Sequence, residues 1–512
     1  MCEGGDLRTA SRRTGGCHSR VWRATLVSVC QPLCFRSEWE CSLKRNCYRS
    51  EIAVQGPRIW LISLLVALVS TSAWAQQQVA RLELIPPSPV TNRVMLDIRG
   101  AVENNGDSDR QYSLSLFLDR ESAATLLHKE NVKVHAHSNV GIYYRHSTEQ
   151  WAGRHRLILV AANASGPVRV MRNLEVLPSD IRSTRTIDGA WVGIAHWSEE
   201  EGRHWNSTIR RLTDADWHDQ IRGMHSLGMD TVVIQESFRN QEYYGRNRMS
   251  STGYKGLAYY PSELFPGRAQ VNAHDAIEAV LSEADRLQMN VFLGVGMYAW
   301  FDFSKDSLDW HKKVAQELWH RYGHHPSFYG WYVSEETYGS LIPDQGESVK
   351  DRYRQEVITF FREFQAFCRQ LAPEKPIMLA PNAHGMLKSQ DVWPVVLAHL
   401  DIVCPFAFHR MPEGDITGEQ SAQIWQAMCD KAQAHLWMDM EAFLFEGVAL
   451  IPRPIGGLIQ DLQRFPNFEK ILCYQYSGIF NSPKARVQPG GSPTVVLYRD
   501  YLAYRQARNQ EN

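Results

Sequence analysis

Two stretches of sequence decide the fold: Phe328-Tyr-Gly-Trp-Tyr-Val-Ser-Glu-Glu336 and Leu436-Trp-Met-Asp-Met-Glu441. In each stretch a short apolar run ends in acidic residues, which is typical of a buried strand that emerges at the edge of a sheet. If strands and helices alternate around them, these acids meet at one mouth of a barrel, where an acid and a carboxylate can face each other. The barrel interpretation therefore requires a regular strand–helix alternation along the chain.

That alternation begins at about residue 187. Apolar runs predict eight strands, at Gly189–Ala195, Thr231–Gln235, Asn290–Gly296, Phe328–Ser334, Pro376–Ala380, Ile402–Phe408, Leu436–Met440 and Ile471–Tyr476. Helical patterns lie between them, and the first begins with a capping-box sequence at Thr213. The pattern predicts an α/β fold, a (β/α)8 TIM barrel over 187–508. A doubly wound open sheet is the alternative, but no Gly-rich phosphate loop follows the first strand.

Residues 76–180 have a different, all-β pattern. Partly alternating runs separated by turn sequences lie at Ala80–Ile85, Val94–Val102, Gln111–Leu118, Asn131–Ala136, Gly141–Arg145, His155–Ala161 and Val168–Val176. Their number and spacing predict an immunoglobulin-like sandwich in front of the barrel, although no Cys–Trp–Cys pattern accompanies them. We expect this domain to pack against the barrel as a structural support.

A secretory signal peptide is predicted over residues 58–75. Arg58 precedes the apolar run Ile59–Val69, and Ala73-Trp74-Ala75 has the small residues of a cleavage site. The mature chain would begin at Gln76, and the absence of a Cys there argues against a lipid anchor. Residues 1–57 are then interpreted as an upstream extension, with translation beginning near Val54, or as a disordered leader. The expected location is periplasmic or extracellular, without a stable membrane anchor.

Composition excludes several other classes of protein. The formal net charge is −1, which does not favour nucleic acid as a partner. The cysteines that follow the predicted signal lie far apart, without metal-ligand or disulfide spacing, at Cys368, Cys404, Cys429 and Cys473. We expect neither a metal nor another cofactor. The 16 Trp and 20 Tyr fit either a large core or a cleft that stacks on sugar rings.

The ends of the predicted strands supply a candidate catalytic pair. Strands four and seven face each other across the mouth of such a barrel, so Glu336 and Glu441 are predicted to approach to about 5 Å, the spacing of a retaining glycosidase. Glu336 would be the general acid/base and Glu441 the nucleophile. Glu335 is the alternative to Glu336, and Asp439 is the alternative to Glu441. If they are not the catalytic acids, we expect both to contact the substrate. Alternation places Ser334 and Glu336 on one face of their strand and Glu335 on the other.

The other strand ends carry residues suited to sugar binding. The hydrogen-bonding candidates are His196, Gln235, Asn382, His409 and Gln475, and the stacking candidates are Trp197, Tyr298, Trp300 and Tyr476. A metal site built from His196, His384, His409 and an acid is the alternative, but no His-x-His or HExxH spacing supports it.

These segments also resemble a known family. Gly330-Trp-Tyr-Val-Ser-Glu-Glu336, Gly228-Met-Asp-Thr-Val-Val-Ile-Gln235 and Leu436-Trp-Met-Asp-Met-Glu441 are similar to motifs of uncharacterised, secreted bacterial TIM barrels that are glycoside-hydrolase-like and catalogued as a domain of unknown function. The resemblance covers roughly 187–480. More distantly, the chain resembles the retaining glycosidases with acids after strands four and seven, which implies Glu336 and Glu441 as the acids. That clan usually has Asn before the strand-four acid, whereas this chain has Glu335.

The sequence thus predicts a secreted glycoside hydrolase that cleaves O-glycosidic bonds of a poly- or oligosaccharide. The alternative is a non-catalytic carbohydrate-binding or polysaccharide-processing accessory protein that has kept the barrel and its aromatic residues. The presence of both strand-end acids favours the enzyme.

Overall fold

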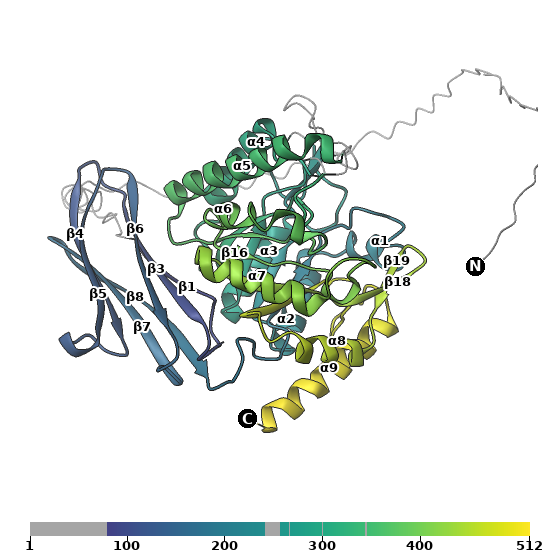
Figure 1. Cartoon of the computed structure of the whole chain (residues 1–512). Helices are drawn as coiled ribbons and strands as arrows, with labels where there is room; N and C mark the ends of the chain where they lie inside the picture. The colour runs from purple at the N-terminus through teal and green to yellow at the C-terminus, as the bar shows by residue number, and fades with distance from the viewer. Residues whose placement is uncertain (1–78, 241–255, 266, 299–300, 344–345, 512) are drawn as a thin grey trace, which may run out of the picture. The chain divides into compact units, whose positions relative to one another are not determined.

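The computed structural model describes residues 79–240, 256–265, 267–298, 301–343 and 346–511 (Figure 1). The predicted leader and signal peptide lie outside this part of the chain. The strands are β1 Val79–Ile85, β2 Val90–Thr91, β3 Met95–Asn104, β4 Arg110–Leu118, β5 Leu126–Val134, β6 Ser138–Ser147, β7 Gly153–Asn163, β8 Gly166–Leu177, β9 Gly189–Val192, β10 Thr231–Ile234, β11 Phe238–Asn240, β12 Gly256–Ala258, β13 Asn290–Gly294, β14 Phe328–Val333, β15 Ile377–Leu379, β16 Ile402–Val403, β17 His435–Glu441, β18 Phe443–Glu446, β19 Ala449–Pro452 and β20 Lys470–Tyr474.

Helices alternate with the later strands. They are α1 Asn206–Ile209, α2 Asp214–Ser226, α3 Ala276–Leu287, α4 Lys305–Tyr322, α5 Lys350–Leu371, α6 Trp393–Leu397, α7 Gly418–Ala432, α8 Ile455–Arg464 and α9 Ser492–Glu511, with short 3-10 turns η1 Ala123–Thr125, η2 Glu347–Val349, η3 Met386–Ser389 and η4 Phe408–Arg410. Helix α2 begins with the expected capping box, in which Thr213 accepts from the Asp216 N–H and Asp216 accepts from the Thr213 N–H.

Eight parallel strands form a closed barrel, in the order β9, β10, β13, β14, β15, β16, β17 and β20, with β20 pairing back to β9. This confirms the predicted eight-stranded parallel barrel. Its interior is filled by large side chains, among them Trp191, Phe292 and Trp437, which belong to one buried cluster. A filled interior leaves the loops at the carboxyl ends of the strands as the place for a binding cavity.

The preceding strands form two sheets that enclose a separate core. One sheet has the order β1-β3-β6 and the other the order β2-β8-β7-β4-β5. All pairs are antiparallel except β2 with β8. Apolar side chains from both sheets, including Leu82, Ile98, Leu114 and Leu159, are buried together. The chain therefore has β-sandwich-like sheets ahead of its barrel, and their immunoglobulin-like arrangement remains a prediction.

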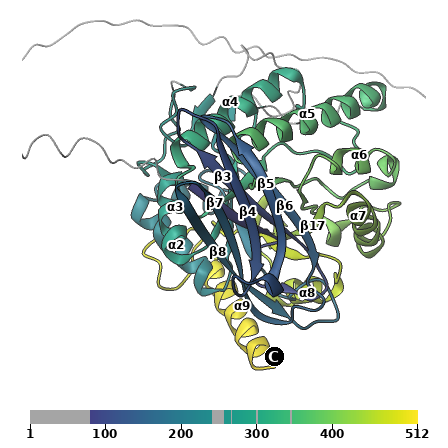
Figure 2. The same cartoon turned by 90° about the vertical axis from the view of Figure 1, so that its left-hand side faces the viewer.

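The sandwich contacts the amino ends of the barrel strands. Ile85, the last residue of β1, belongs to the same buried cluster as the barrel residues Trp191 and Phe292. Nearby, the Tyr329 hydroxyl donates a 2.7 Å hydrogen bond to the Leu84 carbonyl. Figure 2, viewed from the sandwich side, shows these strands lying over the barrel. The contact leaves the opposite end of the barrel, where the strands end, uncovered by the sandwich.

Buried ion pairs hold the two parts together. From the sandwich, Arg99 pairs with Asp401 at 2.7 Å and Glu83 pairs with Lys375 at 2.6 Å. His435, the first residue of β17, lies between two acids: its Nδ1 is 2.7 Å from Glu469 and its Nε2 is 3.4 Å from Asp97. Because these groups are buried, removing one partner leaves its counter-charge without compensation, which is costly.

We expect the stability of the fold to fall between pH 6.5 and 9 through His435. Burial disfavours its charge, but Glu469 and Asp97 outweigh burial and raise its pKa to about 9 from 6.5. A raised pKa gives stability that is complete below the unfolded pKa and is lost as pH rises through the folded one, here about 3 kcal/mol. Urea unfolding at pH 6.5 and 9.5 should show a smaller decrease for His435→Gln than for wild type. The exposed His225→Gln is the control, and equal decreases in all three proteins would contradict the assignment.

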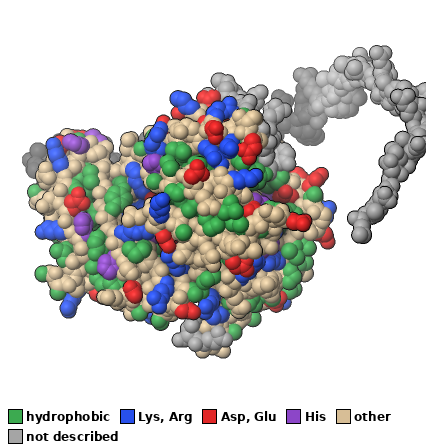
Figure 3. Space-filling view, in the orientation of Figure 1, with side chains coloured by type: hydrophobic (Ala, Val, Ile, Leu, Met, Phe, Trp, Pro, Cys, Tyr) green, Lys and Arg blue, Asp and Glu red, His purple; other side chains and the backbone are tan. Residues whose placement is uncertain are grey.

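Charges are interspersed on the surface face drawn in Figure 3, where Lys and Arg side chains alternate with Asp and Glu. No helix of the described residues is both long and apolar enough to cross a bilayer.

Candidate active site

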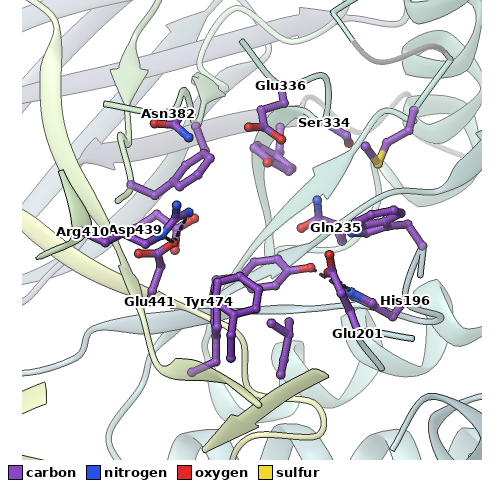
Figure 4. Close-up of a pocket in the computed structure, with 18 residues that line it drawn as sticks. His196, Glu201, Gln235, Ser334, Glu336, Asn382, Arg410, Asp439, Glu441 and Tyr474 are labelled. Atoms are coloured by element: carbon purple, nitrogen blue, oxygen red, sulfur yellow. Dashed lines mark hydrogen bonds and ion pairs between the residues drawn. The ribbon is translucent and has the colours of Figure 1, made fainter. Parts of the chain in front are cut away.

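A cavity of about 240 Å³ lies at the carboxyl ends of the barrel strands (Figure 4). Polar, acidic and aromatic side chains from the ends of several strands converge on it. Its lining residues are His196, Trp197, Glu201, Gln235, Met297, Tyr332, Ser334, Glu336, Ala380, Asn382, Phe406, Arg410, Asp439, Glu441, Phe443, Phe445, Leu450 and Tyr474.

Glu441 is the last residue of β17 and is held as a carboxylate. Its side chain is 2% exposed, Arg410 Nε donates a 2.7 Å hydrogen bond to its Oε1, and His409 Nδ1 lies 3.0 Å from its Oε2. Burial alone would raise its pKa, but His409 and Arg410 outweigh burial and hold the pKa below its usual value. The group is therefore a buried, ionised carboxylate that faces a cavity.

Asp439, two residues earlier on the same face of β17, is in the opposite state. Burial, together with the charges of Glu441 and Glu336, raises its pKa well above the usual value. Its Oδ1 is buried and has no hydrogen-bonding partner among the described residues. Two neighbouring carboxyl groups with divergent pKa values are typical of a site that needs one acid and one base.

Strand β14 delivers Glu336 to the same cavity. Tyr332, Ser334 and Glu336 all line it, as the alternation of the strand predicts. Figure 4 shows Glu336 on a different side of the cavity from Asp439 and Glu441. Glu335 is 1% exposed and turned away, and its Oε1 accepts a 2.7 Å hydrogen bond from the Tyr298 backbone N–H. Glu335 thus supports the loop after β13, and Glu336, in the segment that follows β14, is the acid that faces the cavity.

His196 lies on a third side of the cavity as part of a hydrogen-bonded chain. Its Nε2 is 2.9 Å from Glu201 Oε2, and the Tyr474 hydroxyl is 3.4 Å from its Nδ1. Burial outweighs Glu201 and lowers the pKa of His196, which favours the neutral ring. His196 thus links Glu201 and Tyr474, and all three side chains line the cavity (Figure 4).

The structure places several predicted residues elsewhere. Tyr298 and Tyr476 are fully buried in the barrel core rather than in the cavity lining. Gln475 is 1% exposed and lies against Gly193. These positions correct the expectation that all three line the mouth. Trp300 lies outside the described residues.

The cavity also contains residues that the sequence interpretation missed. Strand eight ends at Tyr474, so Tyr474 rather than Tyr476 faces the cavity. The hairpin of β18 and β19, absent from the prediction, adds Phe443, Phe445 and Leu450.

Arg410 was missed for a local reason. Strand six was predicted to run to Phe408, but β16 ends at Val403. Ala407 then adopts a left-handed conformation, with φ of 72°, and begins the 3-10 turn that carries His409 and Arg410. That turn brings both side chains to Glu441, and a prediction that looks only at the ends of strands does not anticipate it.

One cluster of possible metal ligands occurs among the described residues, and it lies away from the cavity. Glu278, His324 and His325 have ligand atoms within 4.8 Å of one another. His325 is already bonded to Asp285 at 2.7 Å and to Glu278 at 3.1 Å, and it precedes β14 at the amino ends of the strands. These two contacts to acids account for the position of His325 in the cluster as part of the fold.

The solved structures to which the chain is similar include several glycoside hydrolases. Bacteroides uniformis β-glucuronidase 2 is 12% identical with a TM-score of 0.39, covering 83% of this chain and 50% of that one. A β-galacturonidase from Eisenbergiella tayi is 10% identical with a TM-score of 0.38, covering 84% and 72%. Parabacteroides merdae β-glucuronidase is 9% identical with a TM-score of 0.34, covering 83% and 52%. The chain thus spans about half the length of the first of these proteins.

No curated protein matches the sequence. Residues 187–487, more than half of the chain and all of the barrel strands, match the family described as "Domain of unknown function (DUF4434)". The chain therefore belongs to the DUF4434 family.

Proposed function

We propose that this protein is a secreted glycoside hydrolase that cleaves O-glycosidic bonds of an oligo- or polysaccharide by a retaining, two-carboxylate mechanism. The observation that carries the proposal is the pair Glu336 and Glu441: they come from the ends of β14 and β17, they line one cavity, and Glu441 is held ionised by Arg410. Glycosidases of both stereochemical outcomes use two carboxyl groups across the sugar bond, and in double displacement one is the nucleophile and the other the acid/base.

In this mechanism Glu441 attacks the anomeric carbon and Glu336 protonates the departing glycosidic oxygen. The bond to the leaving group breaks while a glycosyl ester forms on Glu441. Glu336, now a carboxylate, then removes a proton from water, which attacks the same carbon and releases Glu441. Arg410 and His409 keep Glu441 ionised at rest, and they stabilise it again as it leaves.

Asp439 has a different role in the proposal. Burial and the charges of Glu441 and Glu336 raise its pKa, which favours the protonated carboxyl, and this form can donate a hydrogen bond into the cavity that Asp439 lines. A sugar hydroxyl beside the anomeric carbon is a fitting acceptor. Gln235 and Asn382, which also line the cavity, can bond further hydroxyl groups.

The test is a screen of the chain from Gln76 against glycans and aryl glycosides, run beside the double variant Glu336→Gln/Glu441→Gln. Cleavage by wild type alone supports the proposal and identifies the sugar, and the anomer first released, followed by NMR, tests the retaining outcome. Binding by both proteins with cleavage by neither would instead favour the carbohydrate-binding accessory protein.

The acid limb of the pH–rate profile should depend on Arg410. Glu441 must be ionised to attack, and its pKa lies below the usual 4.5, so kcat/KM should be maintained down to acidic pH and fall only below that value. Arg410→Leu removes a cation that lowers this pKa, so the acid limb should move to higher pH. A matched Arg352→Leu change, on the surface of α5, should leave the limb in place, and an unmoved limb in Arg410→Leu would contradict the role.

Export is part of the proposal and rests on the apolar run Ile59–Val69 followed by Ala73-Trp74-Ala75. We expect the protein recovered from outside the cytoplasm to begin at Gln76. N-terminal sequencing measures this directly, and Ala75→Arg should block the cleavage. Recovery of a mature protein that still carries residues 58–75 would contradict the signal peptide.

A further inference from the structure

A second cavity adjoins the candidate active site. It has a volume of about 570 Å³ and is formed by the loops that follow β9 and β10, on the same end of the barrel. His196 and Trp197 line both cavities. The first cavity, at about 240 Å³, is below the range of about 300–1,000 Å³ that is common for ligand sites. A ligand that fills both spaces is therefore longer than one that fills the acid-lined cavity alone.

Two hydrogen bonds link segments around the second cavity. Arg239 Nη2 donates a 2.9 Å hydrogen bond to the Ala195 carbonyl, and Asn240 Nδ2 donates a 2.6 Å bond to the Tyr298 carbonyl. These bonds join the two-stranded sheet of β11 and β12 to the segments that follow β9 and β13. The segments around this cavity are thus bonded to one another, and such preorganisation lowers the cost of binding a ligand.

The chemistry of the wall suits neutral sugar units. Arg239 is paired with Glu236, and Arg210 with Glu199, so neither arginine presents an uncompensated charge to a ligand. Gln270 is exposed on the wall, and Trp197, partly exposed, lies where the two cavities meet. An amide can bond hydroxyl groups, and an indole face can pack on the apolar face of a sugar ring.

We infer that the ligand is a glycan chain, with one sugar at the carboxyl groups and at least one further unit in the second cavity, and with Trp197 as the platform between them. This inference rests on the proposed function for the site and adds the length of the substrate to it. Trp197 lines both cavities, so its side chain can contact the sugar units on either side of it.

The test uses the inactive Glu336→Gln/Glu441→Gln protein, so that binding is measured without cleavage. The probes are cello-, xylo-, manno-, malto- and chito-oligosaccharide series of one to six units, titrated by calorimetry. In the series that binds, affinity should rise at least tenfold between one unit and three. Adding Trp197→Ala should reduce that gain at least fivefold, and Gln270→Ala should reduce it about twofold. Gln355→Ala, an exposed glutamine on α5, is the control and should leave it unchanged.

Each outcome separates this inference from the proposed function. An affinity that does not depend on chain length, or a gain that survives Trp197→Ala, overturns the extended site even if wild type cleaves the glycan. Length-dependent binding that Trp197→Ala weakens, without cleavage by wild type, supports the extended site and overturns the hydrolase. No binding to any of the five series overturns the extended site, and cleavage of the glycan and aryl glycoside panel by wild type then decides the hydrolase separately.

Discussion

Glu441→Gln is expected to lower kcat on any cleaved substrate by about four orders of magnitude, or ~5.4 kcal/mol of transition-state stabilisation. The substitution keeps the size of the side chain but removes the ionised oxygen that Arg410 and His409 hold at the cavity. An amide cannot form the glycosyl ester, so the loss should appear in kcat rather than in KM. Steady-state kinetics with an aryl glycoside measure it, and Glu413→Gln, an exposed acid near Arg410, is the matched control.

A chemical rescue separates a nucleophile from a residue that only positions the substrate. In Glu441→Ala the side chain is shortened, and azide can then attack the sugar from the side that the carboxylate occupied. The expected product is a glycosyl azide of inverted anomeric configuration, whereas azide added to Glu336→Ala should give the retained one. If Glu441→Gln keeps near-wild-type turnover, or Asp439→Asn proves the more damaging change, the nucleophile has been assigned to the wrong residue.

The sequence predicts the architecture of the barrel well because its strands are apolar throughout. A strand buried on both faces reads as a continuous apolar run, as in Phe328–Val333, where every residue is buried. The same period-2 alternation, extended past the end of the strand, predicts opposite faces for Glu335 and Glu336, and the structure places Glu336 in the cavity lining and Glu335 against the Tyr298 backbone. Continuous apolar runs and period-2 alternation depend only on neighbouring residues, so they can be recognised in the sequence alone.

Features that depend on where a strand stops were predicted less well. The apolar run Ile471–Tyr476 continues beyond the end of β20, because Tyr476 packs into the core under helix α2, where its hydroxyl approaches Gly223. Hydrophobicity does not separate a residue buried in the last strand from one buried just after it. The prediction therefore overlooked Tyr474, which faces the cavity, in favour of Gln475 and Tyr476.

Partners from distant parts of the chain left no local signal at all. Arg410 reaches Glu441 only because Ala407 turns the chain. Similarly, the pairing of Arg99 in the sandwich with Asp401 before β16 joins residues 302 positions apart. A single sequence shows each charge but not its counter-charge, so neither the ionisation of Glu441 nor the attachment of the sandwich could be read from it.

Asp401→Asn is expected to destabilise the fold by about 3–5 kcal/mol, the cost of breaking a buried ion pair. Asp401 Oδ1 accepts hydrogen bonds from Arg99 at 2.7 Å and Arg369 at 2.6 Å, and its Oδ2 accepts from the Ile377 N–H at 2.8 Å. Burial would raise its pKa, but the two arginines outweigh burial and lower it, so its contribution is present above the unfolded pKa near 4 and is lost as pH falls through the folded value.

Urea unfolding at pH 7 measures the loss, and the exposed Asp391→Asn is the control. In the variant the Arg99 guanidinium stays buried without its anion, so Asp401→Asn combined with Arg99→Met should recover part of the stability. Recovery would assign the cost to an uncompensated charge at the contact between sandwich and barrel rather than to lost packing.

Because this contact lies at the amino ends of the strands, Asp401→Asn should leave KM unchanged at temperatures where the variant is folded. If the Asp401→Asn protein is as stable as wild type, these ion pairs do not hold the sandwich and the barrel together.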